Sequence, residues 1–469
     1  MMKTYNPFCE EMLAELQAAL GAENVWTAAD KLDQYKTDEE TDPKKFHMPE
    51  AVVLPASAEE VAAVVKLCNK YNVPVTVRGG GTSLADGAIP VCGGIVLLTE
   101  RMNKIIEMNT EAMYMIVEAG VRTIDIQKMA NEAGFLYAGD PCSAESCQIG
   151  GNLATNAGGN KAVRYGVTRN QVYCLEMVTP TGEIVEVGAR LKKCSTGYCM
   201  EQLVMGSEGT LGIITKATLK LLPMAPYRFD MLAVFDEPQN AIDVVPKLIK
   251  AGVNPTSIEY MDNSYVRSTA DYLDFKAAPH YEDGIYVIIT VETYNEDELD
   301  LKMEQLNDLC EEAGAVDVLE ADDRIWSMRR NCQESVRLIS LVSLTDDIVV
   351  PVDKIADTIK KIMEIDAKYP FPVPAKINAH VGDGNLHVVL CKGDLSDEDW
   401  EKHVHDFHQE VYAYVYELGG RMAGEHGIGA KKLGYMEEFT PAAELDLMKK
   451  IKLAWDPNLI LNPGKIFNM

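Results

Sequence analysis

Three glycine-dense segments in the first half of the chain constrain its fold most strongly. They read RGGGTS at residues 78–83, CQIGGNLATNAGGNKAVRYG at residues 147–166 and MGSEGTLGIIT at residues 205–215. Glycine has no side chain, so backbone N–H groups in such loops can approach a ligand closely and cradle a phosphate. Apolar, strand-like runs separate the segments. We therefore expect loops of an α+β domain that line one extended ligand, such as a dinucleotide; purely structural turns are the alternative.

The residues before the first glycine segment predict a helix followed by a strand. Ser57 and Glu60 form a capping-box pattern ahead of the apolar-periodic run VAAVVKLCNKY, so the helix should begin after Ser57. Pro74 should end this region, and the β-branched run VTV predicts a strand that leads into residues 78–83. Leu84 stands where the third glycine of G-x-G-x-x-G would be, which argues against a nicotinamide-binding Rossmann fold.

The segment NAHVGDGNLH at residues 378–387 predicts a hairpin that joins two histidines. Asp383-Gly384 is a strong signal for a two-residue type I′ turn, in which both central residues need positive φ. Counted outward from such a turn, His380 opposes His387. Opposed residues share one face of a sheet, with Cβ atoms roughly 4.5–5.5 Å apart. Two imidazoles at this spacing could bind one divalent ion; a strand pair whose histidines only form hydrogen bonds is the alternative.

The segment GRMAGEHGIG at residues 420–429 offers a third metal ligand in Glu425. Two imidazoles and one carboxylate leave coordination positions open, which is typical of a catalytic ion such as zinc, iron or manganese. His426 is then a candidate base beside the metal, because an imidazole titrates near neutral pH. A turn residue at a helix start is the alternative for His426. The same three ligands would also suit a hydrolase, but a hydrolase leaves the glycine segments unexplained.

Length, charge and cysteine content narrow the class of protein. A chain of 469 residues suggests two or three domains, and a formal net charge of −28 would repel nucleic acid and anionic membrane surfaces. No run approaches the ~18 consecutive apolar residues of a membrane helix, so we expect a soluble, cytoplasmic protein. Eleven cysteines without a C-x-x-C pair indicate reduced thiols and not an iron–sulfur cluster. Any electron carrier should be an organic cofactor.

Six motifs occur in an order that points to a known family. They are RGGGTS, IGGNLATNAGG, GSEGTLGIIT, HVGDGNLH, GEHGIG and DPNLILNPGKI. Together they resemble the FAD-linked 2-hydroxyacid dehydrogenases of the vanillyl-alcohol-oxidase superfamily, whose members include D-lactate dehydrogenase, the glycolate oxidase D subunit and D-2-hydroxyglutarate dehydrogenase. The resemblance covers nearly the whole chain from about residue 45 onward.

The resemblance implies an α+β fold with a two-subdomain FAD-binding domain of the PCMH type. It also implies a substrate cap domain with an antiparallel sheet and a C-terminal segment that returns to the flavin. Proline-rich stretches at residues 221–228 and 369–376 agree with loops at domain or hairpin boundaries. The expected parts are a helical segment (1–45), the FAD-binding domain (46–224), the cap domain (225–420) and the C-terminal segment (421–469).

By resemblance, the FAD-binding residues lie in the glycine segments and near the end of the chain. Gln148 stands where relatives carry Thr or His, which puts a side-chain bond there in doubt. No histidine occurs in or near RGGGTS, so the FAD should be non-covalent. The predicted FAD-binding residues are Arg78, Gly79, Gly80, Gly81, Thr82, Ser83, Pro141, Gly150, Gly151, Asn156, Gly158, Gly159, Glu208, Gly209, Gly212, Ile213 (through its backbone) and Asn462.

The resemblance also implies the reaction. Within WSMRRNCQESVR it favours Arg329 over Arg330 as the group that binds the substrate carboxylate, a task that suits the planar guanidinium. A small D-2-hydroxy acid would be oxidised by hydride transfer to FAD, with the metal on His380, His387 and Glu425. In the relative that acts on hydroxyglutarate a lysine stands near the place of Thr345, so D-lactate is favoured here over D-2-hydroxyglutarate, with glycolate also open.

Reduced FAD must pass its electrons onward, and relatives imply a partner. An electron-transfer flavoprotein is the expected acceptor; an iron–sulfur subunit or a quinone are others. A non-catalytic subunit that holds FAD only as an electron relay is a remote alternative, and Arg329 together with the complete ligand set argues against it.

Overall fold

The computed structural model describes residues 3–469, so the first two residues of the expected N-terminal segment lie outside the described residues. The chain forms two compact units. Within the described residues, unit 1 contains residues 3–158, 167–224 and 426–469, and unit 2 contains residues 159–166 and 225–425. The boundary near the C-terminus falls between Glu425 and His426, two residues predicted to act in one site.

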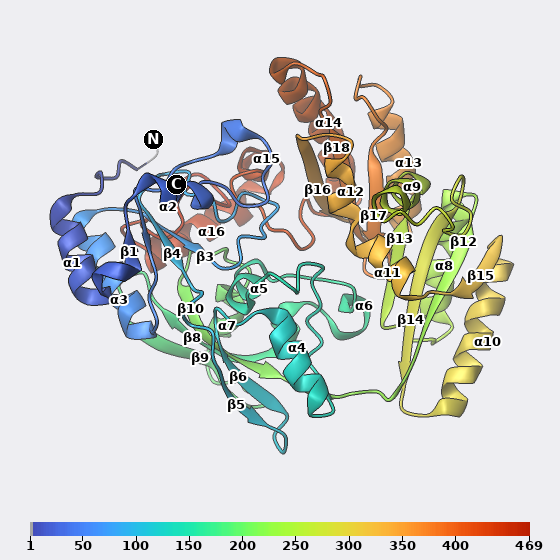
Figure 1. Cartoon of the computed structure of the whole chain (residues 1–469), viewed down its shortest axis with the longest axis horizontal. Helices are drawn as coiled ribbons and strands as arrows, with labels where there is room; N and C mark the ends of the chain where they lie inside the picture. The colour runs from blue at the N-terminus through green and yellow to red at the C-terminus, as the bar shows by residue number, and fades with distance from the viewer. Residues whose placement is uncertain (1–2) are drawn as a thin grey trace. The chain divides into compact units, whose positions relative to one another are not determined.

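Unit 1 is built on two main sheets (Figure 1). In the first, β2, β4 and β3 are parallel and β1 is antiparallel to β2; its order is β1 (Val25–Trp26), β2 (Ala51–Val53), β4 (Ile95–Leu98), β3 (Val75–Arg78). The second is antiparallel throughout, in the order β5 (Ile105–Asn109), β6 (Tyr114–Glu118), β10 (Ile213–Lys220), β8 (Val172–Val178), β9 (Ile184–Gly188). A short pair joins β7 (Phe135–Leu136) to β11 (Leu222–Pro223).

The helix predicted after Ser57 is α3 (Ala58–Tyr71). The Ser57 side chain accepts a hydrogen bond from the backbone N–H of Glu60 at 3.3 Å, as a capping box requires. The Glu60 carboxylate instead accepts from the N–H of Ala56 at 2.7 Å, one residue earlier than expected. The helix ends at Tyr71, its C-cap residue Asn72 is left-handed with φ 55°, and β3 follows as predicted.

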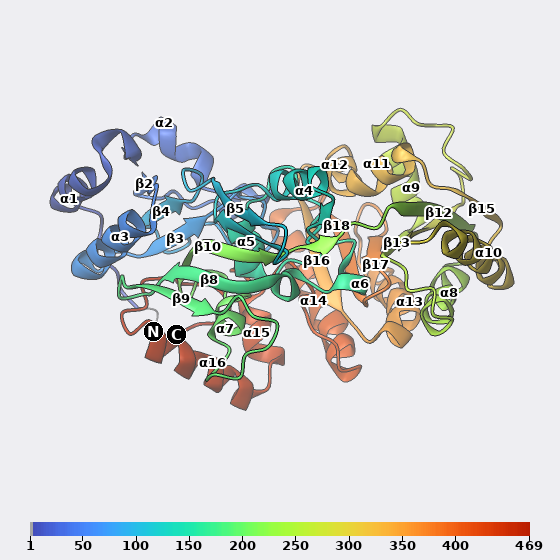
Figure 2. The same ribbon diagram turned by 90° about the horizontal axis from the view of Figure 1, so that it is seen from below.

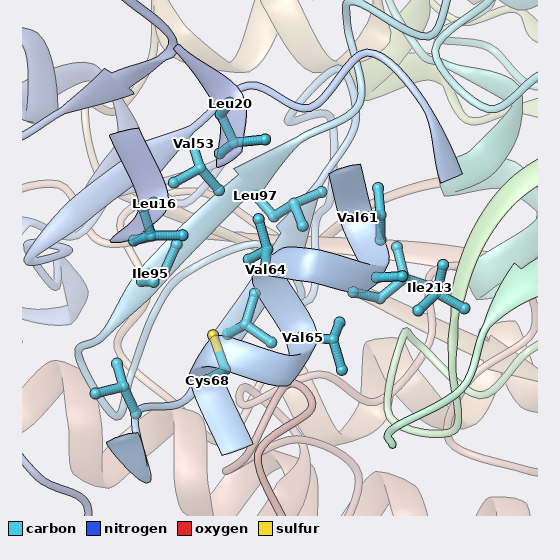
Figure 3. Packing of buried hydrophobic residues seen from close by; sticks show 14 of the residues in the cluster. Leu16, Leu20, Val53, Val61, Val64, Val65, Cys68, Ile95, Leu97 and Ile213 are labelled. Carbon is cyan, nitrogen blue, oxygen red and sulfur yellow. The ribbon is translucent and has the colours of Figure 1, made fainter. Parts of the chain in front are cut away.

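The core of the first sheet is formed by apolar side chains of the helices α1 (Glu10–Leu20) and α3 and of the sheet's own strands, with Val178 and Ile213 from the second sheet (Figure 3). One face of α3 contributes Val61, Val64, Val65 and Cys68, which lie three or four residues apart, the spacing of one helix face. The helix α1 adds its own buried side chains. Figure 3 labels Leu16, Leu20, Val53, Val61, Val64, Val65, Cys68, Ile95, Leu97 and Ile213.

A second core joins α4 and α5 to the five-stranded sheet. Ile126 and Ala130 of α4 (Thr123–Glu132) pack with Ile149 and Leu153 of α5 (Ile149–Thr155) in one buried cluster. The helix α5 lies within the second glycine segment, for which the sequence predicts a loop. The other short helices of unit 1 are α2 (Ala29–Leu32), α7 (Met200–Val204), η1 (Ala22–Asn24), η2 (Asp33–Tyr35), η3 (Pro43–Lys45) and η4 (Thr168–Gln171).

The C-terminal segment returns to the first sheet of unit 1. After α15 (Leu433–Phe439) and α16 (Ala442–Trp455), the chain pairs with the edge strand β3. Val75 donates its N–H to the carbonyl of Ile460 at 2.9 Å and accepts from the N–H of Asn462 at 2.8 Å. This pairing holds Asn462 beside the strand that leads into residues 78–83.

Unit 2 contains one seven-stranded antiparallel sheet. Helices cover both faces: α9, α11 and α12 pack against one, and α8, α10, α13 and α14 lie on the other (Figure 2). The strand order is β15 (Asp317–Glu320), β12 (Tyr227–Phe235), β14 (Ile285–Thr293), β13 (Ser257–Met261), β17 (Lys376–His380), β18 (Asn385–Cys391), β16 (Ser343–Val349). The helices are α6 (Ala162–Tyr165), α8 (Pro238–Lys250), α9 (Asn263–Tyr272), α10 (Glu296–Glu312), α11 (Asp323–Arg330), α12 (Cys332–Arg337), α13 (Ile355–Asp366) and α14 (Asp397–Glu417), with η5 (Val352–Lys354).

The hairpin between β17 and β18 forms, but the predicted two-residue turn is wrong. The connection spans residues 381–384, so His380 opposes Asn385 and His387 opposes Asn378. Gly384 has φ 89°, whereas Asp383 keeps a negative φ, which a type I′ turn does not allow. The Asp-Gly signal also suits longer loops, which explains the error. Because the register differs by two residues, both histidines still face the same side of the sheet.

Within residues 3–469, no helix combines the length with the apolar composition that a membrane crossing requires.

Candidate active site

The two predicted histidines meet on one face of the unit 2 sheet. They are diagonal neighbours on β17 and β18, with ring centroids 5.4 Å apart and ring planes at 88°. Both are buried, with 3% of His380 and 7% of His387 exposed. The two imidazole rings therefore converge from adjacent strands, as the sequence predicted. The strand register that brings them together differs from the predicted one.

Glu425 completes a group of three ligand atoms. Its Oε1 lies 3.3 Å from Nε2 of His380 and 3.1 Å from Nε2 of His387. One donor atom from each of the three residues lies within 4.8 Å of the other two, a spacing at which all three could contact one ion. Two imidazole nitrogens and a carboxylate oxygen are a donor set that zinc, iron and manganese accept.

Neighbouring side chains fix which ring nitrogens face this centre. Glu259 on β13 lies directly opposite His380 and contacts its Nδ1 through Oε1 at 2.8 Å. Asn378 contacts Nδ1 of His387 through Oδ1 at 3.2 Å. An oxygen acceptor at Nδ1 favours the tautomer that protonates this nitrogen and leaves Nε2 with a free lone pair. Both Nε2 atoms can therefore donate a lone pair to a metal ion.

Asp347 on β16 holds the backbone of the third ligand. One carboxylate oxygen accepts hydrogen bonds from the N–H groups of Gly424 and Glu425, both at 2.9 Å. The other accepts from Asn385 at 2.5 Å. A Cβ added at Gly424 would lie 2.3 Å from Nδ2 of Asn385, so only glycine allows this close approach. The fold thus ties the segment that carries Glu425 to the strands that carry the histidines.

Electrostatics at this centre favour a positive charge. Burial alone would raise the pKa of Glu425, but His380 and His387 hold it well below its usual value. Burial would likewise lower the pKa of His380, whereas the carboxylates of Glu259 and Glu425 raise it well above the ordinary range. Two carboxylates on one buried imidazole form a strongly negative environment. A proton or a divalent cation would be stabilised there.

Arg329 on α11 lies beside the cluster and is connected to it through Glu259. Its Nε and Nη2 lie 2.9 Å and 2.7 Å from Oε2 of Glu259, and only 3% of the residue is exposed. The neighbouring Arg330 is exposed and donates to the hydroxyl of Ser327. The buried guanidinium is thus part of the cluster, while the alternative arginine points to the surface.

His426 is the first residue of the C-terminal part of unit 1. The loop that follows it is held by Glu208, which accepts hydrogen bonds from the N–H groups of Ile428 at 2.8 Å and Gly429 at 2.7 Å. Glu208, predicted as an FAD-binding residue, therefore uses its carboxylate to position the segment that begins with His426.

Parts of the three glycine segments come together within unit 1, whereas residues 159–166 of the second segment belong to unit 2. A Cβ added at Gly80 would lie 2.3 Å from the carbonyl oxygen of Ser146, so the first segment packs tightly against the loop that precedes the second. Glu208 of the third segment donates its N–H to the carbonyl of Ala154 at 2.8 Å and accepts from Asn462 Nδ2 at 2.7 Å. These contacts connect parts of the three segments and Asn462, and the binding of FAD by these residues stays a prediction.

The structure gives protein contacts for Arg78, a predicted FAD-binding residue, and for Gln148, which lies in the second glycine segment. Arg78 donates to the carbonyl of Thr37 at 2.6 Å and lies over the ring of Tyr35. Gln148, whose side-chain role was in doubt, accepts from the hydroxyl of Thr99 at 2.6 Å. Gly159 belongs to unit 2, and the other predicted FAD residues belong to unit 1.

Sequence reasoning missed the residues that support the ligands. Glu259 is a single acidic residue in SIEYM, a strand that the structure buries completely, and no sequence signal indicates its partners. Asp347 belongs to LTDDIVVP, a segment that was considered only for Thr345. Asn378 and Asn385 lie in the predicted hairpin, but the incorrect register hid their pairing with the histidines.

Comparisons with known proteins define the class. Residues 227–466 match the family described as FAD linked oxidases, C-terminal domain, and residues 49–188 match the FAD binding domain family. The structure of p-cresol methylhydroxylase with substrate bound shares the fold, with a TM-score of 0.81 at 16% identity over 97% of this chain and 96% of that one. The fold and the two domains together are those of an FAD-dependent oxidoreductase with a PCMH-type FAD-binding domain.

Curated relatives narrow the class to a family. The chain is 38% identical to D-lactate dehydrogenase of Anaerostipes hadrus, over 89% of each chain. It is 34% identical to glycolate oxidase subunit GlcD of Bacillus subtilis, over 91% of this chain and 90% of that one. The chain belongs to the FAD-linked 2-hydroxyacid dehydrogenases, as its six motifs predicted.

Proposed function

We propose that this enzyme oxidises a small D-2-hydroxy acid, with D-lactate the foremost candidate, to the 2-oxo acid. The observation that carries the proposal is the convergence of His380, His387 and Glu425, with Arg329 connected to the same cluster through Glu259. The name of the Anaerostipes hadrus relative supports lactate as the substrate.

The cluster fits a divalent metal on three counts. The three donor atoms converge, both histidines have Nδ1 occupied by an oxygen acceptor, and the surrounding carboxylates favour positive charge. His380, His387 and Glu425 would hold the ion. When bound, the metal would act as a Lewis acid on the substrate hydroxyl, and FAD would accept the hydride.

The protein's own residues then bind the substrate and move its proton. Arg329 is proposed to bind the carboxylate, because a guanidinium matches a carboxylate with two parallel hydrogen bonds. His426 directly follows Glu425 in the chain and is proposed to take the hydroxyl proton. Removal of this proton and of the α-hydrogen as hydride leaves the carbonyl of the 2-oxo acid, so electrons and protons balance.

The neutral pair of Thr345 and Gln333 supports a short substrate. Thr345 lies two residues before Asp347 on β16, and its hydroxyl donates to Oε1 of Gln333 at 3.0 Å. A second carboxylate, as in hydroxyglutarate, would require a cation in place of such a neutral pair. Glycolate remains the second candidate, supported by the name of the Bacillus subtilis relative.

Anaerobic titration of the bound flavin tests this proposal. Both enantiomers of lactate and of 2-hydroxyglutarate, together with glycolate, are added separately while flavin absorbance is followed. We expect D-lactate to bleach the flavin at the lowest concentration. A flavin that stays oxidised with every acid would refute hydroxyacid oxidation, whereas preferential bleaching by glycolate or D-2-hydroxyglutarate would reassign the substrate only.

Electrons should then leave through a separate redox protein. All eleven cysteines are free and, within the described chain, no group of cysteines is gathered as an iron–sulfur cluster would require. An electron-transfer flavoprotein is the proposed acceptor. Substrate-dependent reduction of such a protein in a mixture with this enzyme would support it, and reduction of a quinone alone would favour the other route.

A further inference from the structure

We propose that Glu259 is a positioning residue that couples the metal ligand His380 to the carboxylate-binding Arg329. This inference rests on the proposed function, because it assumes that the cluster binds a metal and that Arg329 binds substrate. It adds a residue that neither the motifs nor the family resemblance identified.

The two oxygens of Glu259 serve different partners. Oε1 lies 2.8 Å from Nδ1 of His380 and also accepts from the hydroxyl of Ser257 at 3.3 Å, while Oε2 lies 2.9 Å and 2.7 Å from two nitrogens of Arg329. One carboxylate thus orients both groups.

The position of Glu259 in the sheet makes this arrangement rigid. The residue is 0% exposed and lies on β13, which is hydrogen-bonded to β14 on one side and β17 on the other. Its direct cross-strand partner is His380. The backbone is fixed on both sides and the carboxylate does not reach solvent. A substitution at this residue should therefore displace both His380 and Arg329.

Only a full-length carboxylate meets both requirements. His380 Nδ1 and Arg329 both present hydrogen-bond donors, and a carboxylate can accept from both. A glutamine offers one accepting oxygen and one NH₂ group, which would face a donor on one side. An aspartate is shorter by one methylene group and should not reach both partners from the same backbone position. Either replacement should therefore disturb metal binding, arginine placement or both.

The test compares Glu259→Gln with Glu292→Gln. Glu292 is a matched control because it is also a buried glutamate of the unit 2 sheet, on β14, with Tyr165 and Thr256 as its partners. Each protein is purified with FAD, stripped of metal by a chelator, and titrated with Zn²⁺ by calorimetry in the absence of substrate. The KM for D-lactate is then measured at saturating metal.

We expect Glu259→Gln to bind Zn²⁺ about 10- to 100-fold more weakly, the range typical of outer-shell partners of metal ligands. The KM of this variant for D-lactate should also rise at saturating metal, because Arg329 loses the carboxylate that holds its guanidinium in place. Glu292→Gln should match the wild type in both measurements. Should Glu259→Gln fail to yield soluble flavoprotein, Glu259→Asp replaces it, with the same directions expected.

Three results would overturn the inference: unchanged Zn²⁺ affinity in the Glu259 variant, weakened affinity with an unchanged KM, or an equal loss in the Glu292 control. A wild-type protein that binds no Zn²⁺ at all would instead refute the metal in the proposed function, so the two failures can be distinguished.

Discussion

At the scale of single residues, the chemistry of the site depends on how each side chain is oriented. The sequence identified His380, His387 and Glu425 because their residue types and the hairpin pattern point to a metal. It could not identify Glu259, because a lone glutamate in a strand has no sequence signal for its partner. The 2.8 Å contact to His380 joins residues 121 positions apart, which only folding brings together.

The proposed base gives a prediction at this scale. In His426→Ala, the rate constant for flavin reduction by D-lactate should fall by about 10²- to 10⁴-fold, the usual contribution of a positioned general base. Stopped-flow absorbance under anaerobic conditions measures it. His405→Ala, an exposed histidine of α14, is the control and should leave the rate unchanged. A normal rate in His426→Ala would remove this residue from the base role.

At the scale of elements, the strands and turns decide where ligands lie. Alternation along β17 and β18 was sufficient to predict that the histidines share a face, since a shift of two residues preserves it. The loop length was not predictable, because Asp-Gly occurs in several turn types and its choice depends on the strands that flank it. The segment before Glu425 likewise depends on Asp347 of β16, an element remote in sequence.

This dependence predicts the effect of a methyl group at Gly424. Because an added Cβ would lie 2.3 Å from Asn385 Nδ2, Gly424→Ala should displace the backbone that carries Glu425. We expect Zn²⁺ affinity to fall at least about tenfold, by analogy with loss of an outer-shell contact, while FAD content stays normal. Gly434→Ala is the control, since a Cβ there meets no atom within 4 Å. Equal affinities in the two variants would contradict the role of this close approach.

At the scale of the whole molecule, unit 1 is assembled from segments far apart in the chain. Lys431 lies two residues after the GEHGIG motif, and its side chain is buried. Its Nζ lies 3.3 Å from Oε2 of Glu40 and 3.6 Å from Oδ1 of Asp86. Burial would raise the pKa of Glu40, but Lys431 and Lys45 lower it to about 2. Burial raises the pKa of Asp86 to about 6, and the charge of Glu40 adds to this rise. Two carboxylates thus share one buried ammonium group, and Asp86 retains its proton more readily.

This cluster predicts a pH-dependent stability. The folded-state pKa of Asp86 exceeds its unfolded value of 3.8, so its contribution is fully present below pH 3.8 and is lost as the pH rises through about 6. In Asp86→Asn the side chain does not titrate. The free energy of unfolding of this variant relative to wild type, and with it the relative Tm, should therefore increase from pH 5 to pH 8. The full effect of a shift of about two pKa units is about 3 kcal/mol, and about half of it falls above pH 5.

Calorimetric or fluorescence melting of the FAD-loaded protein across this pH range measures the difference. Asp30→Asn, an exposed residue of α2, serves as control and should track the wild type. A constant difference between Asp86→Asn and wild type from pH 5 to pH 8 would rule out the proposed titration.

By itself, the sequence determined the family, the helix after Ser57, the glycine segments and the residues able to hold a metal, because these depend on local propensity and on residue type. The tertiary structure decided the hairpin register, the division of the chain at Glu425 and His426, and the contacts of Glu259 and Asp347. These features depend on which remote segments become neighbours, and local sequence carries little information about that choice.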